Sequence, residues 1–246
     1  MKEQAPKHRV FIRGFTGKVI SDPGTVRHLV KVLRLREGDI FTGYDGGREM
    51  MFRVAGTKGD VVTVDCIEER TLAKCSNVRL TVAQALLKGK RWDIFLEKMV
   101  ELGAGRIVPL MTVNTVIRLE AREIEKKVER WHKIAQGAAA QSGGGCVPEI
   151  TEPMDFSEFL NIRSDASARC ILAAGGESVG LREFLSGGIR GEIIVAVGPE
   201  GDFTSEELDK AKTSGFVPVS LGYRIFRSET AAIVAAVIIL YEGKTL

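Results

Sequence analysis

The sequence predicts an α/β protein with a small, mostly β region followed by a larger domain in which helices cover a parallel sheet. From Val78 onward, short apolar runs alternate with longer segments of helical periodicity, as expected for a parallel sheet. Before that point, short β-branched runs are separated by tight turns. With 246 residues, 44% of them hydrophobic, the chain can bury a large core. We place the two domains at residues 1–72 and 73–246.

The N-terminal region has the pattern of a small barrel. A helix is expected from His28 to Leu35, because Leu29, Val32 and Leu33 share one face. The polar stretch Thr71–Asn77 is interpreted as a linker. Strands are expected where short apolar runs are bounded by glycine turns: Val10–Ile12, Ile40–Tyr44, Met50–Ala55 and Val61–Cys66.

The first half of the larger domain alternates strands and helices. A strand begins at Val78, and a helix with five apolar residues at helical spacing, from Trp92 to Val100, stops at Gly103. A second, charged helix is expected from Glu120 to about Gln141, ended by the glycines at 143–145. Further strands are expected at Ile107–Leu110 and from Ile171.

The stretch Ile193–Leu240 contains the order strand, glycine loop, helix twice. The strands are Ile193–Val197 and Val217–Leu221, and the loops are Gly198–Phe203 and Gly222–Arg227. Loops that follow the carboxyl ends of parallel strands line the ligand crevice, so we expect a binding site here. Thr204 with Glu207 forms a capping-box pattern, Ser228 is a candidate cap, and the last helix, Ala231–Tyr241, is apolar enough to be buried.

Charge is concentrated at the N-terminus. Residues 1–36 hold nine Lys and Arg against two acids, which gives +7, whereas the whole chain has +3. A basic end of this kind suits a polyanion, and it equally suits a solvated surface. No apolar segment at the N-terminus or elsewhere is long enough for a signal or a membrane span. The four cysteines suggest no disulfide framework, which fits a reducing cytoplasm, so a cytoplasmic protein is expected.

Several chemistries have no support in the sequence. The four cysteines lack CxxC spacing and the three histidines are scattered, so neither a metal site nor a disulfide framework is indicated. The dinucleotide fingerprint, the phosphate-binding P-loop and the nucleophile elbow are absent. What remains are two glycine loops flanked by charged side chains: Glu200, Asp202, Arg224, Arg227 and Glu229.

Taken together, Gly198-Pro199-Glu200-Gly201 and Leu221–Ala231 (LGYRIFRSETA) resemble the C-terminal signature of the RsmE family. The stretches His28–Asp39, Lys88–Arg91 and Lys98–Gly103 resemble other parts of the same family. The resemblance implies a SPOUT-type trefoil-knotted domain behind a PUA-like barrel. It also implies a homodimer that uses S-adenosylmethionine to methylate uridine N3 in 16S rRNA of the small ribosomal subunit.

The resemblance implies roles for particular residues. Arg227 is expected to stabilise charge on the uracil, and Glu229 or Glu200 to handle a proton, although either glutamate could instead favour the sulfonium or fix the loop. Gly201 is expected to approach the cofactor closely with a positive φ. The expected cofactor-binding residues are Leu172, Gly198, Pro199, Glu200, Gly201, Leu221, Gly222, Arg224, Ile225, Phe226, Arg227 and Thr230. The expected RNA-binding residues are Arg9, Arg13, His28, Arg34, Lys88 and Arg91.

The chain also departs from the family pattern. Asp202 stands where a second glycine is usual, and aspartate tolerates unusual backbone angles. Ala140 and Gly144 replace an acid and an arginine, and Val113-Asn114 replaces an acid-arginine pair. These losses are expected to affect RNA engagement, substrate identity or full activity more than cofactor binding. Two alternatives stay open: a non-catalytic RNA-binding protein of the same fold, and a SPOUT enzyme that acts on another RNA.

Overall fold

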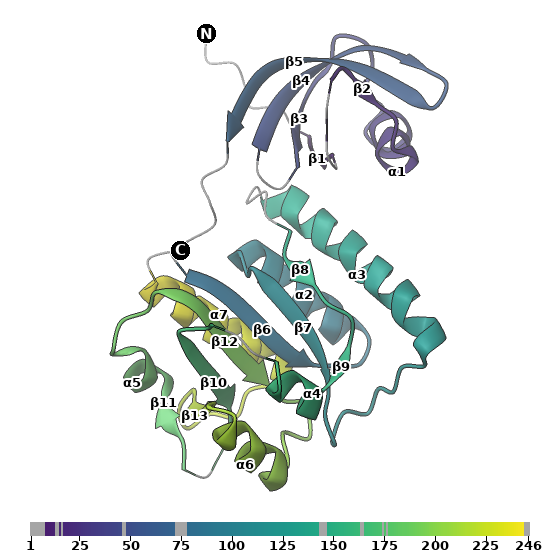
Figure 1. Ribbon diagram of the computed structural model, residues 1–246. Helices are drawn as coiled ribbons and strands as arrows, with labels where there is room; N and C mark the ends of the chain where they lie inside the picture. The colour runs from purple at the N-terminus through teal and green to yellow at the C-terminus, as the bar shows by residue number, and fades with distance from the viewer. Residues whose placement is uncertain are drawn as a thin grey trace. The chain divides into compact units, whose positions relative to one another are not determined.

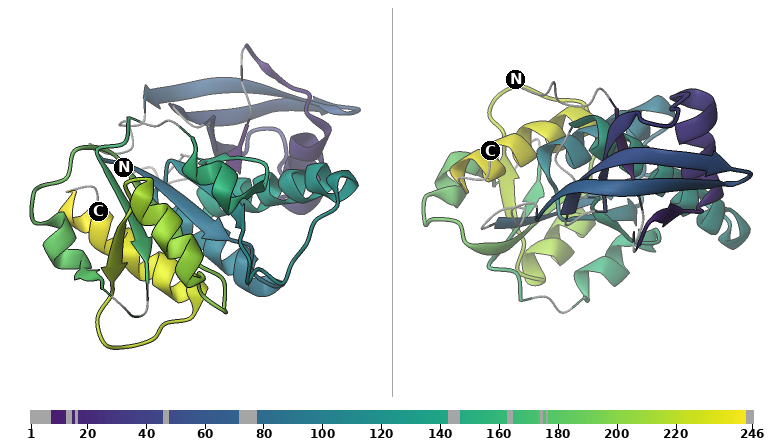
Figure 2. Two further views of the ribbon diagram at one scale, coloured as in Figure 1. Left: turned by 60° about the horizontal axis from the view of Figure 1, so that its bottom comes forward. Right: turned by 90° about the horizontal axis from the view of Figure 1, so that it is seen from above.

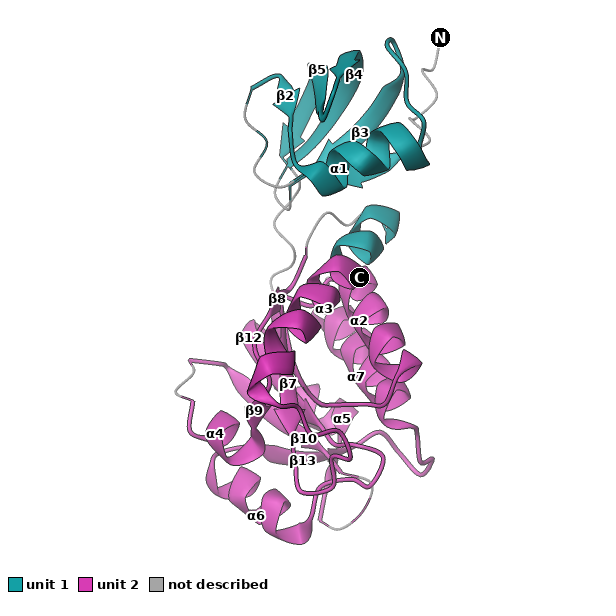
Figure 3. Ribbon diagram, turned by 90° about the vertical axis from the view of Figure 1, so that its right-hand side faces the viewer, with its two compact units in different colours: residues 1–74, 136–146 teal, residues 75–135, 147–246 magenta. Residues whose placement is uncertain are grey.

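The computed structural model describes residues 8–12, 15, 17–45, 48–71, 78–142, 147–162, 165–173, 175 and 177–243. The chain divides into two compact units, residues 1–74 with 136–146 and residues 75–135 with 147–246 (Figure 3). Each unit contains its own sheet. The domain boundary expected after residue 72 stays a prediction, and the linker expected at Thr71–Asn77 lies outside the described residues except for Thr71, which ends a strand.

The first unit is a curled five-stranded sheet with the order β1-β3-β4-β5-β2 (Figure 1). Strand β1 pairs with β3 in parallel and the other pairs are antiparallel. Phe41, Phe52 and Val64 are fully buried in its core. The strands are β1 (Arg9–Phe11), β2 (Val19–Ile20), β3 (Ile40–Tyr44), β4 (Arg48–Lys58) and β5 (Val61–Thr71).

The helical segment of this unit begins earlier than the apolar pattern predicts. Helix α1 (Pro23–Arg27) starts at Asp22, whose carboxylate accepts a hydrogen bond from the Thr25 backbone N–H at 2.7 Å. This hydrogen bond lowers the pKa of Asp22. The π-helical turn η1 (His28–Val32) continues from α1. The apolar pattern could not reveal the start, because only Val26 is buried in the first turn.

Strands β4 and β5 are both longer than predicted, and β2 was not predicted. The outer ends of the long hairpin are mostly exposed, so they lack the apolar alternation that marks a half-buried strand. Strand β2 has only two residues, too few for any periodicity to show. These errors therefore fall where backbone pairing, rather than burial of side chains, forms the strand.

The second unit is a parallel sheet with the order β11-β13-β10-β12-β6-β7-β8, and β9 also pairs with β7 (Figure 1). The strands are β6 (Val78–Ala85), β7 (Arg106–Met111), β8 (Glu149–Ile150), β9 (Met154–Asp155), β10 (Ala168–Leu172), β11 (Val179–Gly180), β12 (Gly191–Val197) and β13 (Val217–Ser220). The helices are α2 (Lys90–Leu102), α3 (Ala121–Ser142), α4 (Phe156–Leu160), α5 (Leu181–Leu185), α6 (Ser205–Thr213) and α7 (Ser228–Glu242).

Helices cover both faces of this sheet. Helices α2 and α7 lie together on one face, and α4 and α6 lie on the other (Figures 1 and 2). Aromatic residues of the second face, Phe156, Phe159, Phe203 and Phe216, form one buried cluster with strand residues. Central strand β12 is buried on both sides, as its unbroken β-branched run predicts.

Local sequence signals predicted the end of α2 and the start of α6 correctly. Helix α2 buries the five predicted apolar residues and ends at Gly103 with φ 82°. Helix α6 has the predicted capping box, with both hydrogen bonds between Thr204 and Glu207. The cap predicted for α7 is wrong: Arg227 occupies the N-cap position, and the Ser228 hydroxyl donates to the Gly198 carbonyl instead.

Among the described residues, no helix combines the length and apolar character needed to cross a membrane. The same residues contain no cluster of three or more potential metal ligands. Cys66 and Cys170 are free thiols. The glycines at 143–145, expected to end α3, lie outside the described residues, and the helix is described as far as Ser142.

Candidate active site

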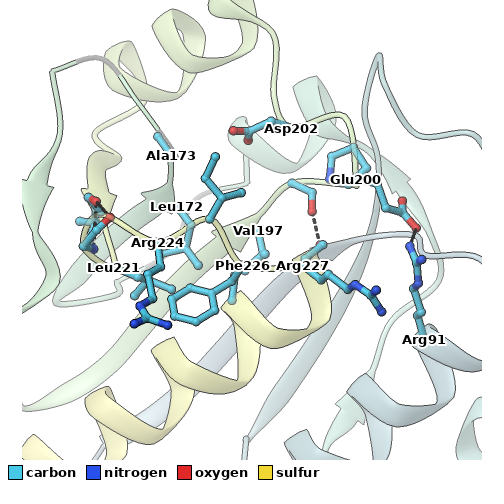
Figure 4. Close-up of a pocket in the computed structure, with 18 residues that line it drawn as sticks. Arg91, Leu172, Ala173, Val197, Glu200, Asp202, Leu221, Arg224, Phe226 and Arg227 are labelled. Carbon is cyan, nitrogen blue, oxygen red and sulfur yellow. Dashed lines mark hydrogen bonds and ion pairs between the residues drawn. The ribbon is translucent and has the colours of Figure 1, made fainter.

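A cavity of about 440 Å³ lies at the carboxyl ends of three neighbouring strands, β10, β12 and β13 (Figure 4). Ligand crevices of open parallel sheets occupy this edge. The two predicted glycine loops form much of its wall. The lining residues are Arg91, Leu172, Ala173, Val197, Gly198, Pro199, Glu200, Asp202, Val219, Ser220, Leu221, Gly222, Arg224, Ile225, Phe226, Arg227, Ser228 and Ala231.

The first loop, residues 198–203, is held by hydrogen bonds from several directions. Its own turn is closed by the Asp202 N–H, which donates to the Pro199 carbonyl at 3.0 Å. The Asn114 side-chain amide donates to the carbonyls of Gly201 and Asp202, both at 3.0 Å. Because Asn114 follows β7, this contact fastens the loop after β12 to the end of a strand two positions away in the sheet.

The positive φ expected at Gly201 is wrong, because it occurs at Asp202, where φ is 56°. The Asp202 side chain accepts a hydrogen bond from the Phe203 N–H at 2.8 Å, which stabilises this local turn. Asp202 also lines the cavity, whereas Gly201 does not. A Cβ at Gly201 would lie 3.1 Å from the Asn114 Cβ, so the glycine allows the close approach of the neighbouring loop rather than an unusual φ.

A buried polar group joins the first loop to the start of α7. Gln84, in β6 and fully buried, donates from its amide nitrogen to the Ser228 hydroxyl at 2.8 Å and to the Gly198 carbonyl at 3.4 Å. The Ser228 hydroxyl donates to the same Gly198 carbonyl. The first loop and the start of α7, which both carry cavity residues, are thus connected to β6 through one side chain. Sequence reasoning missed Gln84, since a glutamine in an apolar strand has no local signature.

The second loop, residues 221–227, has far fewer contacts. Tyr223 is 89% exposed and Ile225 is 85% exposed, which is unusual for large apolar side chains. The hydrogen bonds described for the loop are local: Ser220 with Gly222, and Arg224 with the Tyr223 hydroxyl at 3.2 Å. The Arg224 guanidinium also lies 5.5 Å from the centre of the Tyr223 ring.

The charged residues near the cavity are unequally paired. Glu200 accepts a hydrogen bond from Arg91 at 2.8 Å (Figure 4). Glu229 lies 4.0 Å from the same guanidinium. Glu229 is buried, and its Oε2 has no hydrogen-bond partner in the described part of the chain. Arg227 is exposed and forms no ion pair or side-chain hydrogen bond with the residues described.

Most of the residues predicted to bind the cofactor lie together in the cavity wall. Gly201 and Thr230 do not line it, and of the three predicted catalytic residues Glu229 does not. Lining residues that the sequence analysis did not assign to the site are Ala173, Val197, Asp202, Val219, Ser220, Ser228 and Ala231. Three of these, Ala173, Val197 and Ser220, end or directly follow a parallel strand, so the strand-end rule could have indicated them.

The predicted RNA-binding residues are spread over both units. In the first unit, Arg9 forms an ion pair with Glu49, His28 and Arg34 are exposed, and Arg13 lies outside the described residues. Arg34 has φ 55°, a left-handed conformation that is costly for a residue with a side chain. In the second unit, Lys88 is exposed and Arg91 lines the cavity.

The departures from the family pattern fall in different places. Asn114 contacts the first loop, so its predicted effect on RNA rather than on the cofactor site is not supported by its position. The Val113 N–H donates to the Glu207 carboxylate at 2.9 Å, which ties the same segment to the start of α6. Ala140 lies in the last turns of α3, and Gly144 lies outside the described residues.

Comparison with known proteins relates this chain to RNA methyltransferases. Residues 74–240 match the model of the RNA methyltransferase domain family. The ribosomal RNA small subunit methyltransferase E of Bacillus subtilis is 30% identical over 90% of this chain and 89% of the relative. The Synechocystis protein of the same name is 34% identical over 85% of this chain and 68% of its own length.

Solved structures give the same relationship. A methyltransferase from Legionella pneumophila, in complex with S-adenosylmethionine, matches with a TM-score of 0.87 and 28% identity over 95% of this chain and 96% of its own. The ribosomal RNA small subunit methyltransferase E of Neisseria gonorrhoeae, also bound to S-adenosylmethionine, matches with a TM-score of 0.83 and 28% identity. The match covers 95% of this chain and 97% of the Neisseria chain. The predicted fold class is confirmed: a barrel-like sheet comes first in the chain, and a SPOUT-type α/β domain follows it. This chain belongs to the ribosomal RNA small subunit methyltransferase E family.

Proposed function

We propose that this protein transfers a methyl group from S-adenosylmethionine to small-subunit ribosomal RNA, with uridine N3 as the acceptor. The observation that carries the proposal is the cavity at the ends of β10, β12 and β13, where both loops of the family signature meet. A cavity of about 440 Å³ is in the size range of small-molecule sites.

The cavity wall fits the chemistry of this cofactor. Leu172, Val197, Val219, Leu221 and Phe226 supply apolar surface for an adenine ring. Glu200 and Asp202 favour a cationic sulfonium and ammonium, while Arg224 and Arg227 favour a carboxylate. When bound, the cofactor supplies an electrophilic methyl group. Gly198 makes room for the tight loop, since a Cβ there would lie 3.0 Å from the Asp202 Oδ1 and 3.2 Å from the Phe203 nitrogen.

Arg227 is the side chain best suited to stabilise negative charge on the uracil during transfer. Two nearby glutamates could pair with Arg227 if it only shaped the loop. Glu200 is instead hydrogen-bonded to Arg91, and Glu229 lies 4.0 Å from the same guanidinium. Since Arg227 has no partner among the residues described, the planar donors of its guanidinium are available at the cavity wall for a uracil carbonyl. Glu229 has a buried carboxylate oxygen that receives no hydrogen bond from the described part of the chain, which suits it to accept a proton or an N–H group.

A single-turnover experiment at saturating cofactor and RNA tests this role. Arg227→Ala and Arg227→Lys are expected to lower the rate about a hundredfold, as is typical when one charge-stabilising donor is lost. Affinity for cofactor and RNA should change little. Arg182→Ala, which removes an exposed arginine of α5 that does not line the cavity, serves as the control. A near-wild-type rate for Arg227→Ala ends the catalytic assignment.

The function itself is tested by mass spectrometry of 16S rRNA nucleosides from cells with and without the gene, and by adding purified protein and cofactor to the deficient subunits. We expect N3-methyluridine only when the protein is present. Methylation of a different RNA would support the alternative substrate, and RNA binding without methylation would support the non-catalytic alternative. Because the substrate is ribosomal RNA, we place the protein in the cytoplasm.

We also propose that the protein is a homodimer in which α7 contributes to the interface. Val237 and Tyr241, one turn apart on α7, are 38% and 69% exposed, and Ile225 of the second loop is 85% exposed. A second copy would cover this apolar surface. Light scattering should report a dimer for the wild type and a monomer for Val237→Glu with Tyr241→Glu. Val116→Glu, at a residue 62% exposed outside α7, should leave the dimer intact.

A further inference from the structure

A second cavity, of about 930 Å³, lies between the start of α2 and the N-terminal half of α3. We call it the α2–α3 cavity. All of its residues belong to the second unit. It is lined by Leu86, Leu87, Gly89, Lys90, Trp92, Asp93, Ile117, Leu119, Arg122, Glu123, Lys126, Lys127, Arg130 and Trp131.

The floor of this cavity is aromatic. The Trp92 and Trp131 rings lie 5.0 Å apart between centroids, and each residue is 3% exposed. The indole N–H of Trp92 is buried and has no acceptor among the described residues. A buried donor without an acceptor is unfavourable, and an acceptor on a ligand in the cavity would satisfy it.

The rim of the cavity is basic. Lys90, Lys126 and Lys127 are exposed and have no ion-pair partner within the described part of the chain. Arg130 is held by Asp93 through two hydrogen bonds, at 2.7 and 2.8 Å, which fixes its planar guanidinium at the wall. Free lysines around an aromatic floor are typical of single-stranded nucleic acid sites.

The start of α2 adds a further feature for an anion. Its N-cap residue, Gly89, has φ 58° and offers no side chain to cap the first turn. The backbone N–H groups and positive dipole at such a helix end favour a phosphate. Gly89, Lys90 and Trp92 line the α2–α3 cavity, whereas Arg91 between them lines the cofactor cavity. One helical turn therefore separates the two cavities.

We propose that the α2–α3 cavity binds a nucleotide next to the methylated one in the RNA substrate. The base occupies the cavity above the tryptophans, and its phosphate lies against Lys90, Lys126 and Lys127. This inference rests on the proposed function, because it assigns the neighbouring nucleotide of the same RNA. Three observations support it: the aromatic floor, the lysines that have no ion-pair partner among the described residues, and the first turn of α2, which contributes residues to both cavities.

The protein provides its own reporter for this site. The chain has two tryptophans, and both line the cavity. Titration with a short single-stranded RNA should therefore change the intrinsic tryptophan fluorescence, with the same midpoint as RNA binding measured by filter retention. A polyglutamate peptide of equal charge should cause no such change. Filter binding without a fluorescence change, or an equal response to the peptide, would overturn the proposal.

Two variants test the rim and the floor separately. Lys126→Ser with Lys127→Ser should weaken RNA binding and lower the salt slope by about 1.4, as expected for two lost phosphate contacts with a single strand. Lys210→Ser with Lys212→Ser removes the same charge from α6, away from both cavities, and should leave the slope unchanged. Trp92→Phe keeps a ring but removes the N–H, and should weaken binding about threefold to tenfold. An identical slope in the two double variants would refute the rim assignment.

Failure of this inference can be told apart from failure of the proposed function. If the subunit is methylated but Lys126→Ser with Lys127→Ser has an unchanged KM for RNA, the cavity assignment fails and the function stands. If no RNA is methylated although RNA changes the tryptophan fluorescence as predicted, the function fails and the cavity assignment is limited to RNA binding. Cofactor binding measured by calorimetry should be the same in all of these variants.

Discussion

The two glycine loops that line the cavity at the ends of β10, β12 and β13 each follow a parallel strand, but they are held very differently. The first loop is fastened by Asn114, by Gln84 and by the ion pair of Glu200 with Arg91. With the residues that the structure describes, the second loop forms only local hydrogen bonds, and it exposes Tyr223 and Ile225 almost fully. We infer that the first loop is ordered before the cofactor binds and that the second is ordered by its ligands. A preorganised first loop reduces the entropy lost when the cofactor binds, and a loosely held second loop allows the cofactor to enter the cavity.

The largest expected loss of cofactor affinity follows from adding side-chain volume to the first loop. In Gly198→Val, the Cβ alone would lie 3.0 to 3.2 Å from Asp202 and Phe203, and the loop has little freedom to move. An overpacking cost of about 2–3 kcal/mol corresponds to a loss of cofactor affinity of roughly 30- to 150-fold. Isothermal titration calorimetry measures this loss.

Gly222→Val is the matched change in the second loop. A Cβ at Gly222 meets no atom within 4 Å, so the cost there is only backbone strain at φ 109°. Because this loop has few partners, it can relax, and we expect less than a tenfold loss. Equal losses of cofactor affinity in Gly198→Val and Gly222→Val would contradict the inference that the first loop is held more tightly than the second.

Removing the buried link between the loop and α7 should have the next largest effect. Gln84→Leu keeps the apolar volume but leaves the Gly198 carbonyl and the Ser228 hydroxyl without the amide donor. The loss of buried hydrogen bonds, about 1–3 kcal/mol, predicts roughly a 5- to 150-fold rise in the cofactor Kd at saturating RNA. Methyl transfer at saturating cofactor should recover, which a general loss of folding would not allow.

A smaller effect is expected at Asn114, because its side chain is exposed and water can replace part of its contact. Asn114→Ala removes the hydrogen bonds to the Gly201 and Asp202 carbonyls. A loss of about 1 kcal/mol predicts a fivefold to tenfold weaker cofactor affinity by calorimetry. Val113→Ala leaves its backbone hydrogen bond with Glu207 in place and provides the control. If Asn114→Ala alters RNA affinity alone, the contact with the first loop has no role in cofactor binding.

The smallest effect on cofactor affinity is expected from Tyr223→Ser. The side chain is 89% exposed and does not line the cavity, so the cofactor Kd should change less than about twofold. Dimerisation should weaken instead if a second copy covers this loop, which analytical ultracentrifugation over a concentration series would show. A large loss of cofactor affinity with an unchanged dimer would place Tyr223 in the cofactor site.

The sequence by itself determined the elements whose signal is local. The alternation from Val78 onward, the Gly103 stop of α2 and the capping box of α6 are all visible in a few adjacent residues. The two C-terminal motifs were enough to indicate the family and most of the cavity wall. These features need only periodicity, glycine geometry or a short motif, so no tertiary contact has to be known.

Only the tertiary structure decided which distant residues hold those motifs. Gln84, Arg91 and Asn114 are separated from the first loop by about ninety to a hundred and fifteen residues, and their contacts follow from the parallel pairing of the strands. The parallel pairing also brings Ser228 next to Gly198, so its hydroxyl donates to the Gly198 carbonyl and does not cap α7 as expected. The positive φ expected at Gly201 occurs at Asp202 instead. The close approach of Asn114 requires a glycine at position 201, and the Asp202 side chain stabilises the turn by accepting a hydrogen bond from the Phe203 N–H.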